Sequence, residues 1–247
     1  MQRLRKYLLI LFFFVLALLL SGFFLFQISK SRSFQFYGGL TRRINTDQKV
    51  VALTFDDAPS PYVGEVLGIL KEKDVAATFY EIGGAIEQYP QEAKAIVEAG
   101  SEVGNHSYSH ERFLLKNRSF IDSEIGKTNS LIKDSGYLGE ITFRPPNGKK
   151  LIGLPRYLRE HGIKTIMWDV EPDTYAAGIA EGEEKTKFLV DYTLENAKPG
   201  SIILLHPFCD SCASDRRAIG QIIDGLRAKG YRFATVSELL RYPKNTQ

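Results

Sequence analysis

The stretch Ser201-Ile202-Ile203-Leu204-Leu205, followed by His206, decides the fold class. An apolar run of this length is typical of a β-strand that is buried on both faces, as in a parallel sheet. Six further short runs predict strands, at residues 50–55, 76–80, 102–105, 142–144, 165–169 and 232–235.

Helical patterns alternate with these strands, for example at residues 62–71, 90–98 and 120–133. Pro90 suits a first helical position, and Gly100, Gly162 and Gly230 stand where helices are expected to end. About seven β-then-α units predict one α/β domain, either a barrel or a doubly wound sheet. In both architectures the chemistry gathers at the carboxyl ends of the strands.

The composition of the 247 residues is that of a globular protein, with 44% hydrophobic and 25% charged residues, which excludes a disordered or low-complexity chain. Two cysteines are too few for a disulfide scaffold. Four of the 32 Lys and Arg residues lie within residues 1–30, which leaves 28 bases against 29 acids in the rest. This nearly neutral body argues against a nucleic-acid partner.

The basic N-terminus has the pattern of a membrane segment. Residues 8–26 contain only one clearly polar residue, Ser21, and a helix needs about 20 apolar residues to cross a bilayer. A cleaved signal peptide is the alternative, but its apolar core is usually shorter, about 7–15 residues. Arg3, Arg5 and Lys6 favour a cytoplasmic N-terminus. We therefore expect a transmembrane anchor (1–30), a tether (31–48) and a catalytic domain (49–247) outside the cytoplasm.

Asp56 and Asp57 follow the first strand of the domain. A turn or a helix N-cap is the structural interpretation of this pair. Because successive side chains of an extended segment point in opposite directions, we expect the two carboxylates to face different partners.

Three of the four histidines also lie at predicted strand ends. His106 and His110 are spaced so that they project from one side if the stretch begins a helix, close enough to share a metal. His206 ends the strand at residues 201–205. The fourth, His161, is expected to contact exposed carbonyls at a helix end.

Two further strand ends supply charged groups. Arg144 precedes Pro145-Pro146, on a stiff segment that can hold a carboxylate in place. The segment after the fifth strand contains Trp168, Asp169, Glu171 and Asp173. Two histidines and one carboxylate are a known catalytic set for zinc or another first-row metal, and a second carboxylate can act as base. Together these residues predict metal-assisted hydrolysis of an amide or ester.

These segments resemble, in order, the motifs of the polysaccharide deacetylase family, also called NodB-homology domains or family-four carbohydrate esterases. Four stretches carry the resemblance: Thr54-Phe55-Asp56-Asp57, His106-Ser107-Tyr108-Ser109-His110, Arg144-Pro145-Pro146 and Ile203-Leu204-Leu205-His206. The resemblance implies that Asp56 is the base, that Asp57, His106 and His110 hold the metal, that Arg144 orients the base and that His206 is the general acid. It also implies a single distorted (β/α) barrel with about seven parallel strands, and a divalent metal that is typically zinc, with cobalt as an alternative.

The sequence departs from the family pattern at positions that the resemblance expects to line the substrate groove. Ala58 stands in place of a usual glycine, Asn147 in place of a frequent aromatic residue, and Pro207 follows the histidine of the last motif. The fourth motif matches only after a shift of one residue. We therefore choose Asp173 as the acid that orients His206, with Asp169 as the alternative.

Cys209 and Cys212 lie just after His206, and outside the cytoplasm such a pair favours a disulfide that stiffens the loop. A redox or zinc site is the alternative.

The sequence thus predicts a membrane-anchored, metal-dependent hydrolase that removes N-acetyl groups from amino sugars of an envelope glycan. A deformylase or other amide hydrolase on the same centre is one alternative. A non-catalytic glycan-binding domain is another. Glycoside hydrolysis is disfavoured, because adjacent aspartates that face apart would not flank one bond.

Overall fold

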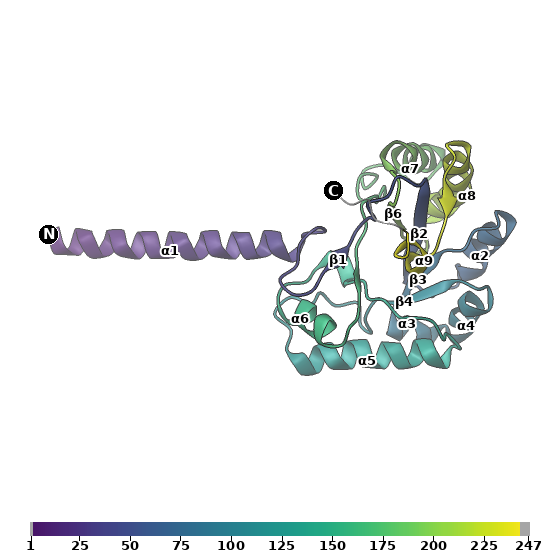
Figure 1. The fold of residues 1–247 in the computed structure, drawn as a ribbon. Helices are drawn as coiled ribbons and strands as arrows, with labels where there is room; N and C mark the ends of the chain where they lie inside the picture. The colour runs from purple at the N-terminus through teal and green to yellow at the C-terminus, as the bar shows by residue number, and fades with distance from the viewer. Residues whose placement is uncertain (1, 243–247) are drawn as a thin grey trace.

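The computed structural model describes residues 2–242, in which a long helix projects from an α/β body (Figure 1). This helix, α1 (Gln2–Ser29), contains the predicted anchor. Within the described chain it is the one helix long and apolar enough to cross a membrane, a property that a signal sequence shares.

The body is built around β2 (Val50–Ala58), the central strand of a parallel sheet in the order β4-β3-β2-β6. Its neighbours are β3 (Thr78–Glu81), β4 (Glu102–Asn105) and β6 (Ile202–Leu205), and the short β7 (Arg232–Phe233) also pairs with β2. A second pair joins β1 (Leu40–Thr41) to β5 (Thr165–Ile166). Single parallel bridges continue the ring from Asn105 to Phe143, from Phe143 to Thr165 and from Val170 to Ile203. The sheet thus closes into a distorted barrel, which settles the choice between a barrel and a doubly wound sheet.

The predicted fourth strand, at residues 142–144, is reduced to the bridges at Phe143. Pro145 and Pro146 follow at once, and because proline has no backbone N–H it cannot donate to the ladder, so pairing stops there. The predicted tether also differs from the structure. Leu40 and Thr41 pair with β5, and Ile44 is buried and donates to the carbonyl of Gly200.

Helices cover the outside of the barrel (Figure 1). Three of them, α2 (Val63–Glu72), α4 (Pro90–Glu98) and α5 (Arg118–Asp134), match the predicted ranges within two residues. The others are α3 (Gly83–Gln88), α6 (Gly153–Glu160), α7 (Glu183–Asn196), α8 (Ala213–Ala228), α9 (Val236–Leu239) and the 3-10 turn η1 (Pro146–Gly148). His161 follows α6, and its Nδ1 atom lies 2.8 Å from the Tyr157 carbonyl oxygen, as expected for a helix end.

Successive side chains of β2 point to opposite faces of the strand, and this decides which of them reach the active centre. Val51, Leu53 and Phe55 pack in the large cluster with the helices, whereas Val50 and Ala52 belong to the cluster inside the barrel. Side chains of a strand alternate between its two faces. Thr54 and Asp56 therefore continue the inner set, at the carboxyl end of the strand.

Candidate active site

The end of β2 turns both aspartates toward the same space. Asp57 has a left-handed backbone (φ 67°), and the register between β2 and β3 shifts between Asp56 and Ala58. The Nε2 atom of His106 consequently lies 3.6 Å from Asp56 and 3.7 Å from Asp57. The expectation that the two carboxylates face different partners holds in part: Asp56 pairs with Arg144 and Asp57 with His110. Both also reach His106, because the bulge interrupts the alternation on which the expectation rested.

Asp56 is buried against a buried arginine. Nη1 of Arg144 donates to Oδ1 of Asp56 (2.7 Å) and to the Thr54 hydroxyl (2.9 Å), and neither charged side chain is more than 3% exposed. The Arg144 guanidinium also lies over the Tyr80 ring, 4.0 Å from its centre. Burial alone would raise the pKa of Asp56, but Arg144, His106 and His206 together lower it. Asp56 is thus a fixed, ionised carboxylate, as a proton acceptor must be.

Asp57, His106 and His110 form a three-residue group suited to a metal ion, with their ligand atoms within 4.8 Å of one another. Oδ1 of Asp57 is 3.3 Å from Nε2 of His110 and is a buried oxygen without a hydrogen-bond partner. Nδ1 of His106 lies 2.8 Å from the Arg144 carbonyl oxygen, which leaves Nε2 free as a ligand. Burial, the largest effect, lowers the pKa of His106 and favours the neutral ring that binds metals. The donor set and the unpartnered oxygen both fit a divalent first-row ion.

The two histidines come together through a loop rather than a helix. Ser107 and His110 both have positive φ angles (69° and 57°), which no helix allows. Oδ1 of Asn105 accepts the amide of Ser107 (2.7 Å). One carboxylate oxygen of Glu124, on α5, accepts the amides of Tyr108 (3.1 Å) and Ser109 (2.9 Å). The i, i+4 spacing therefore does bring two candidate ligands together, but through a loop and not through the helix that was expected.

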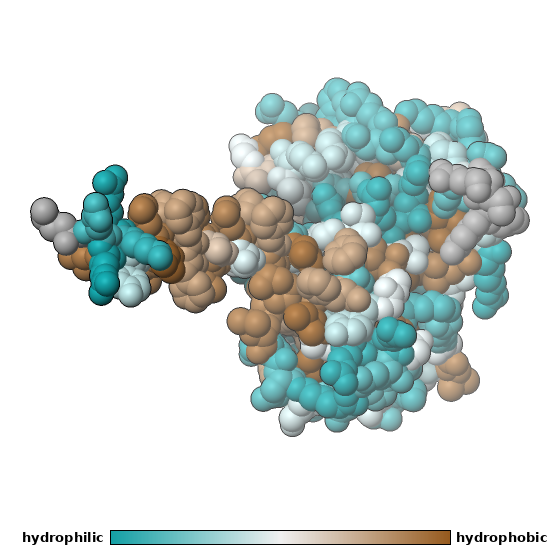
Figure 2. All heavy atoms as spheres, turned by 60° about the vertical axis from the view of Figure 1, so that its left-hand side comes forward, coloured by the Kyte–Doolittle hydropathy of each residue, from teal (hydrophilic) through white to brown (hydrophobic). Residues whose placement is uncertain are grey.

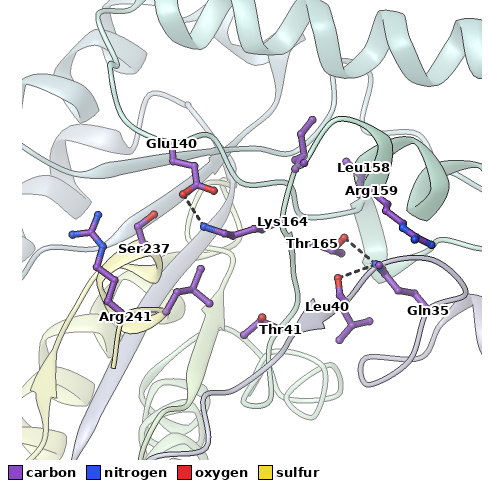
Figure 3. A pocket seen from close by; sticks show the side chains of 15 residues that line it. Gln35, Leu40, Thr41, Glu140, Leu158, Arg159, Lys164, Thr165, Ser237 and Arg241 are labelled. Carbon is purple, nitrogen blue, oxygen red and sulfur yellow. Dashed lines mark hydrogen bonds and ion pairs between the residues drawn. The ribbon is translucent and has the colours of Figure 1, made fainter. Parts of the chain in front are cut away.

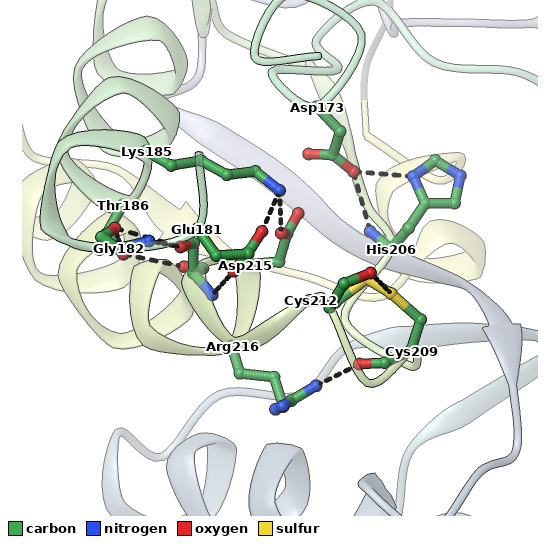
Figure 4. A network of polar contacts seen from close by, with 12 residues as sticks. Asp173, Glu181, Gly182, Lys185, Thr186, His206, Cys209, Cys212, Asp215 and Arg216 are labelled. Carbon is green, nitrogen blue, oxygen red and sulfur yellow. Dashed lines mark hydrogen bonds and ion pairs between the residues drawn. A yellow bond between two sulfur atoms is a disulfide. The ribbon is translucent and has the colours of Figure 1, made fainter. Parts of the chain in front are cut away.

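His206 lies on the other side of the site, at the end of β6, and contacts Asp173 (Figure 4). The Oδ2 atom of Asp173 is 2.7 Å from Nδ1 of His206 and also accepts its backbone amide (3.0 Å). Desolvation lowers the pKa of His206, but the bond to Asp173 outweighs it and brings the pKa to about 9. Asp169, the alternative, instead accepts the Ser201 hydroxyl and the Ile202 amide. The structure thus places Asp173, and not Asp169, where it can orient His206.

The chain belongs with known deacetylases. The sequence profile of the family described as polysaccharide deacetylase matches residues 43–166. A peptidoglycan-N-acetylglucosamine deacetylase of Bacillus cereus is 32% identical over 212 residues, covering 83% of this chain and 94% of that protein. The chain is a member of the polysaccharide deacetylase family.

Other relatives and solved structures also support membership of this family. PdaC of Bacillus subtilis, a peptidoglycan-N-acetylmuramic acid deacetylase, is 32% identical over 83% of this chain but over 41% of its own length. The crystal structure of the peptidoglycan N-acetylglucosamine deacetylase Bc1960 matches with a TM-score of 0.74 at 28% identity, covering 83% of this chain and 94% of that one. BA3943, a pseudoenzyme of the same family from Bacillus anthracis, also matches with a TM-score of 0.74, at 29% identity over 85% of this chain and 71% of that one. Membership in this family, rather than the direction of the aspartates, is what disfavours glycoside hydrolysis.

The loop after His206 is fixed in two ways (Figure 4). Nη1 of Arg216, on α8, donates to the carbonyls of Pro207 and Cys209, at 2.8 Å each. Cys209 and Cys212 form the predicted disulfide. The hydrogen bonds and the disulfide restrict the backbone that carries His206 of this deacetylase.

A pocket of about 420 Å³ is lined by five of the predicted site residues, Asp56, Asp57, His106, His110 and His206. Its walls include Trp168, Glu171 and Asn147, and also Lys30 and Arg32 from the segment just after α1. Sequence reasoning did not assign Lys30, Arg32 or Glu124 to the site. No local signal marks them, because each reaches the deacetylase centre only through tertiary packing.

Proposed function

We propose that this protein is a metal-dependent deacetylase that releases acetate from N-acetylated amino sugars of an envelope glycan. The observation that carries the proposal is the unpartnered Oδ1 atom of Asp57 beside two imidazoles, flanked by a held carboxylate and by a histidine–aspartate pair. Zinc is the proposed ion, since imidazole and carboxylate donors in this number suit it, and cobalt is the alternative.

The residues divide the proton transfers of amide hydrolysis between the two sides of the pocket. Asp56, ionised and held by Arg144, accepts a proton from the attacking water. His206, protonated because Asp173 raises its pKa, gives a proton to the departing amine. The products are acetate and a free amino sugar. Asp57, His106 and His110 would hold a divalent ion, which would supply a lower pKa for water and stabilisation of negative charge on the carbonyl oxygen.

The proposed location is the outer side of a membrane, with α1 as an uncleaved anchor. The apolar length of α1 and the bases Arg3, Arg5 and Lys6 in its first two turns support this orientation. The relatives that are peptidoglycan deacetylases support an envelope substrate.

A non-catalytic glycan-binding protein is the second candidate, because BA3943 is called a pseudoenzyme despite a similar fold. A mutant of BA3943 has restored enzymatic activity, so substitution can decide between the two states on this fold. The presence here of Asp56, Asp57, His106, His110 and His206 in one pocket favours catalysis.

The test is acetate release by the full chain from N-acetylglucosamine oligomers and peptidoglycan, after metal removal and after zinc or cobalt is restored. We expect activity that depends on the metal and that Asp56→Asn abolishes while metal content and fold are kept. Metal binding without acetate from any of these glycans would favour the binding protein or another acyl group.

A further inference from the structure

The end of α1 is joined to the rim of the catalytic pocket. Ser29, its last residue, is buried, and its carbonyl accepts the backbone amide of Lys150 (2.9 Å). The Lys150 ammonium, itself 1% exposed, donates to the carbonyl of Ser31 (2.5 Å). Lys150 follows Asn147 and Gly148, which line the pocket. Both hydrogen bonds hold α1 directly beside the active centre.

The next residues then form one wall of that pocket. Arg32 makes an ion pair with Glu171 (3.3 Å) and lies over the Trp168 ring, while the Trp168 indole donates to the same carboxylate (2.9 Å). Lys30 lines the pocket as well. The segment just after α1 is therefore also part of the pocket wall.

With α1 as the anchor, the pocket would lie at the level of the lipid headgroups. The apolar run of α1 ends at Phe26, and at about 1.5 Å per residue Lys30 follows only about 6 Å later. The headgroup layer on each side of the hydrocarbon core is about 5–7 Å thick.

Figure 2 shows hydrophobic side chains continuing from α1 over the adjoining part of the body. Phe34, Phe36 and Ile152 are exposed large hydrophobic residues that follow Ser31 or Lys150 closely in sequence. Such a surface suits contact with a bilayer.

A basic pair stands at the same place, made of Lys30 and Lys149. Their ammonium groups lie 5.1 and 4.9 Å from the centre of the Phe26 ring. Burial, then the charge of Lys30, lower the pKa of Lys149. Within residues 2–242 no carboxylate lies within ion-pair distance of either lysine, whereas Arg32 has Glu171. Unneutralised lysines at a membrane surface attract phosphate.

We infer that the substrate is an N-acetylated amino sugar joined through phosphate to a membrane lipid, with Lys30 and Lys149 binding the phosphate while the sugar enters the pocket. This inference rests on the proposed deacetylase function and on α1 as an anchor. It assigns a phosphate site beside the catalytic pocket and explains why the anchor is rigidly joined to the body instead of tethered. The same lysines would bind a free sugar phosphate, so the lipid has to be tested separately.

The experiment uses the full chain in neutral phosphatidylcholine vesicles and three substrates: polyprenyl-phosphate-linked N-acetylglucosamine, N-acetylglucosamine 1-phosphate and an N-acetylglucosamine tetramer. We expect the lipid-linked sugar to have the highest kcat/KM. The ratio of its kcat/KM to that of the tetramer should fall at least tenfold in the double variant Lys30→Gln/Lys149→Gln, through KM. The matched control Lys187→Gln, an exposed lysine on α7 paired with Asp191, should leave the ratio unchanged.

Several results would overturn the inference. They are an unchanged ratio in the double variant, equal use of the free and lipid-linked phosphates, and turnover of the tetramer without turnover of the lipid-linked sugar. A variant effect that follows added phosphatidylglycerol whatever the substrate would assign the basic pair to bulk lipid. Failure of all three substrates, the tetramer included, would count against the deacetylase function itself.

Discussion

Two of the pockets in the described part of the chain are similar in size, and one of these two carries chemistry. The catalytic pocket, about 420 Å³, lies at the carboxyl ends of the strands. The other, about 530 Å³, is lined by residues of β1, of the start of β5 and around α9 (Figure 3). In the second pocket Glu140 is already paired with Lys164 (2.8 Å), and the Gln35 amide donates to the carbonyls of Tyr37 and Gly39. In the first, carboxylates and imidazoles converge on an unpartnered oxygen.

The comparison teaches that volume does not locate the active site. Parallel strands release their last residues at one edge, where the following loops bring side chains from several units together. At the opposite edge Glu140 and Lys164 neutralise each other. Carboxylates and imidazoles that converge on one point therefore identify the functional end of the barrel better than the size of a cavity.

The largest expected contrast between the two pockets is in metal binding. Asp57→Ala should lower the metal bound after dialysis at least tenfold and acetate release by about 10³-fold or more, because it removes a ligand. Lys164→Ala, in the second pocket, should change neither by more than twofold. Metal analysis and acetate assays on both variants check this. Retained metal in Asp57→Ala would contradict the assignment of the ligands.

The loss of an ion pair should lower the free energy of unfolding by different amounts at the catalytic pocket and at the second pocket. Arg144→Met leaves Asp56 buried without its partner, and breaking a buried ion pair in this way costs about 3–5 kcal/mol. Breaking the exposed pair with Glu140→Gln should cost less than about 1 kcal/mol. Urea unfolding of the three proteins measures both differences. Arg144→Lys keeps the charge, and it should recover stability better than activity because it cannot hold Thr54 and Asp56 with one planar group.

The pH dependence of activity tests whether Asp173 raises the pKa of His206. His206 acts in its protonated form, so activity is present below its pKa, about 9, and is lost as the pH rises through that value. Asp173→Asn removes the charge that raises the pKa, so its alkaline limb should lie at least one pH unit below that of the parent protein. Measurement of kcat against pH checks this, and an unmoved limb would reduce Asp173 to a structural residue.

The smallest effect is expected from the loop disulfide. Cys209 and Cys212 are only three residues apart, and closing so short a loop stabilises a fold by about 2 kcal/mol. Cys209→Ser/Cys212→Ser should lower the unfolding midpoint by a few degrees and kcat less than tenfold, because Arg216 still holds the loop. Thermal unfolding and acetate assays with and without reductant test this. A collapse of activity would show that the disulfide alone fixes His206.

Sequence reasoning succeeded where the signal is local. The apolar run before His206 is β6, and the range 90–98 is α4, starting at Pro90 as expected. It was less successful where pairing needs a distant partner. The strand expected at residues 142–144 is only a bridge at Phe143, and Leu40–Thr41 becomes a strand only because β5 lies beside it.

The sequence by itself determined the alternation of strands and helices, the apolar N-terminal segment and the residue types of the catalytic set, because these depend on periodicity and on short motifs. Only the tertiary structure decided that Asp56 and Asp57 face one space, since the bulge at Asp57 is a departure from strand geometry. It also selected Asp173 over Asp169 and brought Lys30 and Arg32 to the pocket. Those contacts join residues far apart in the chain, and packing, which no local pattern encodes, fixes them.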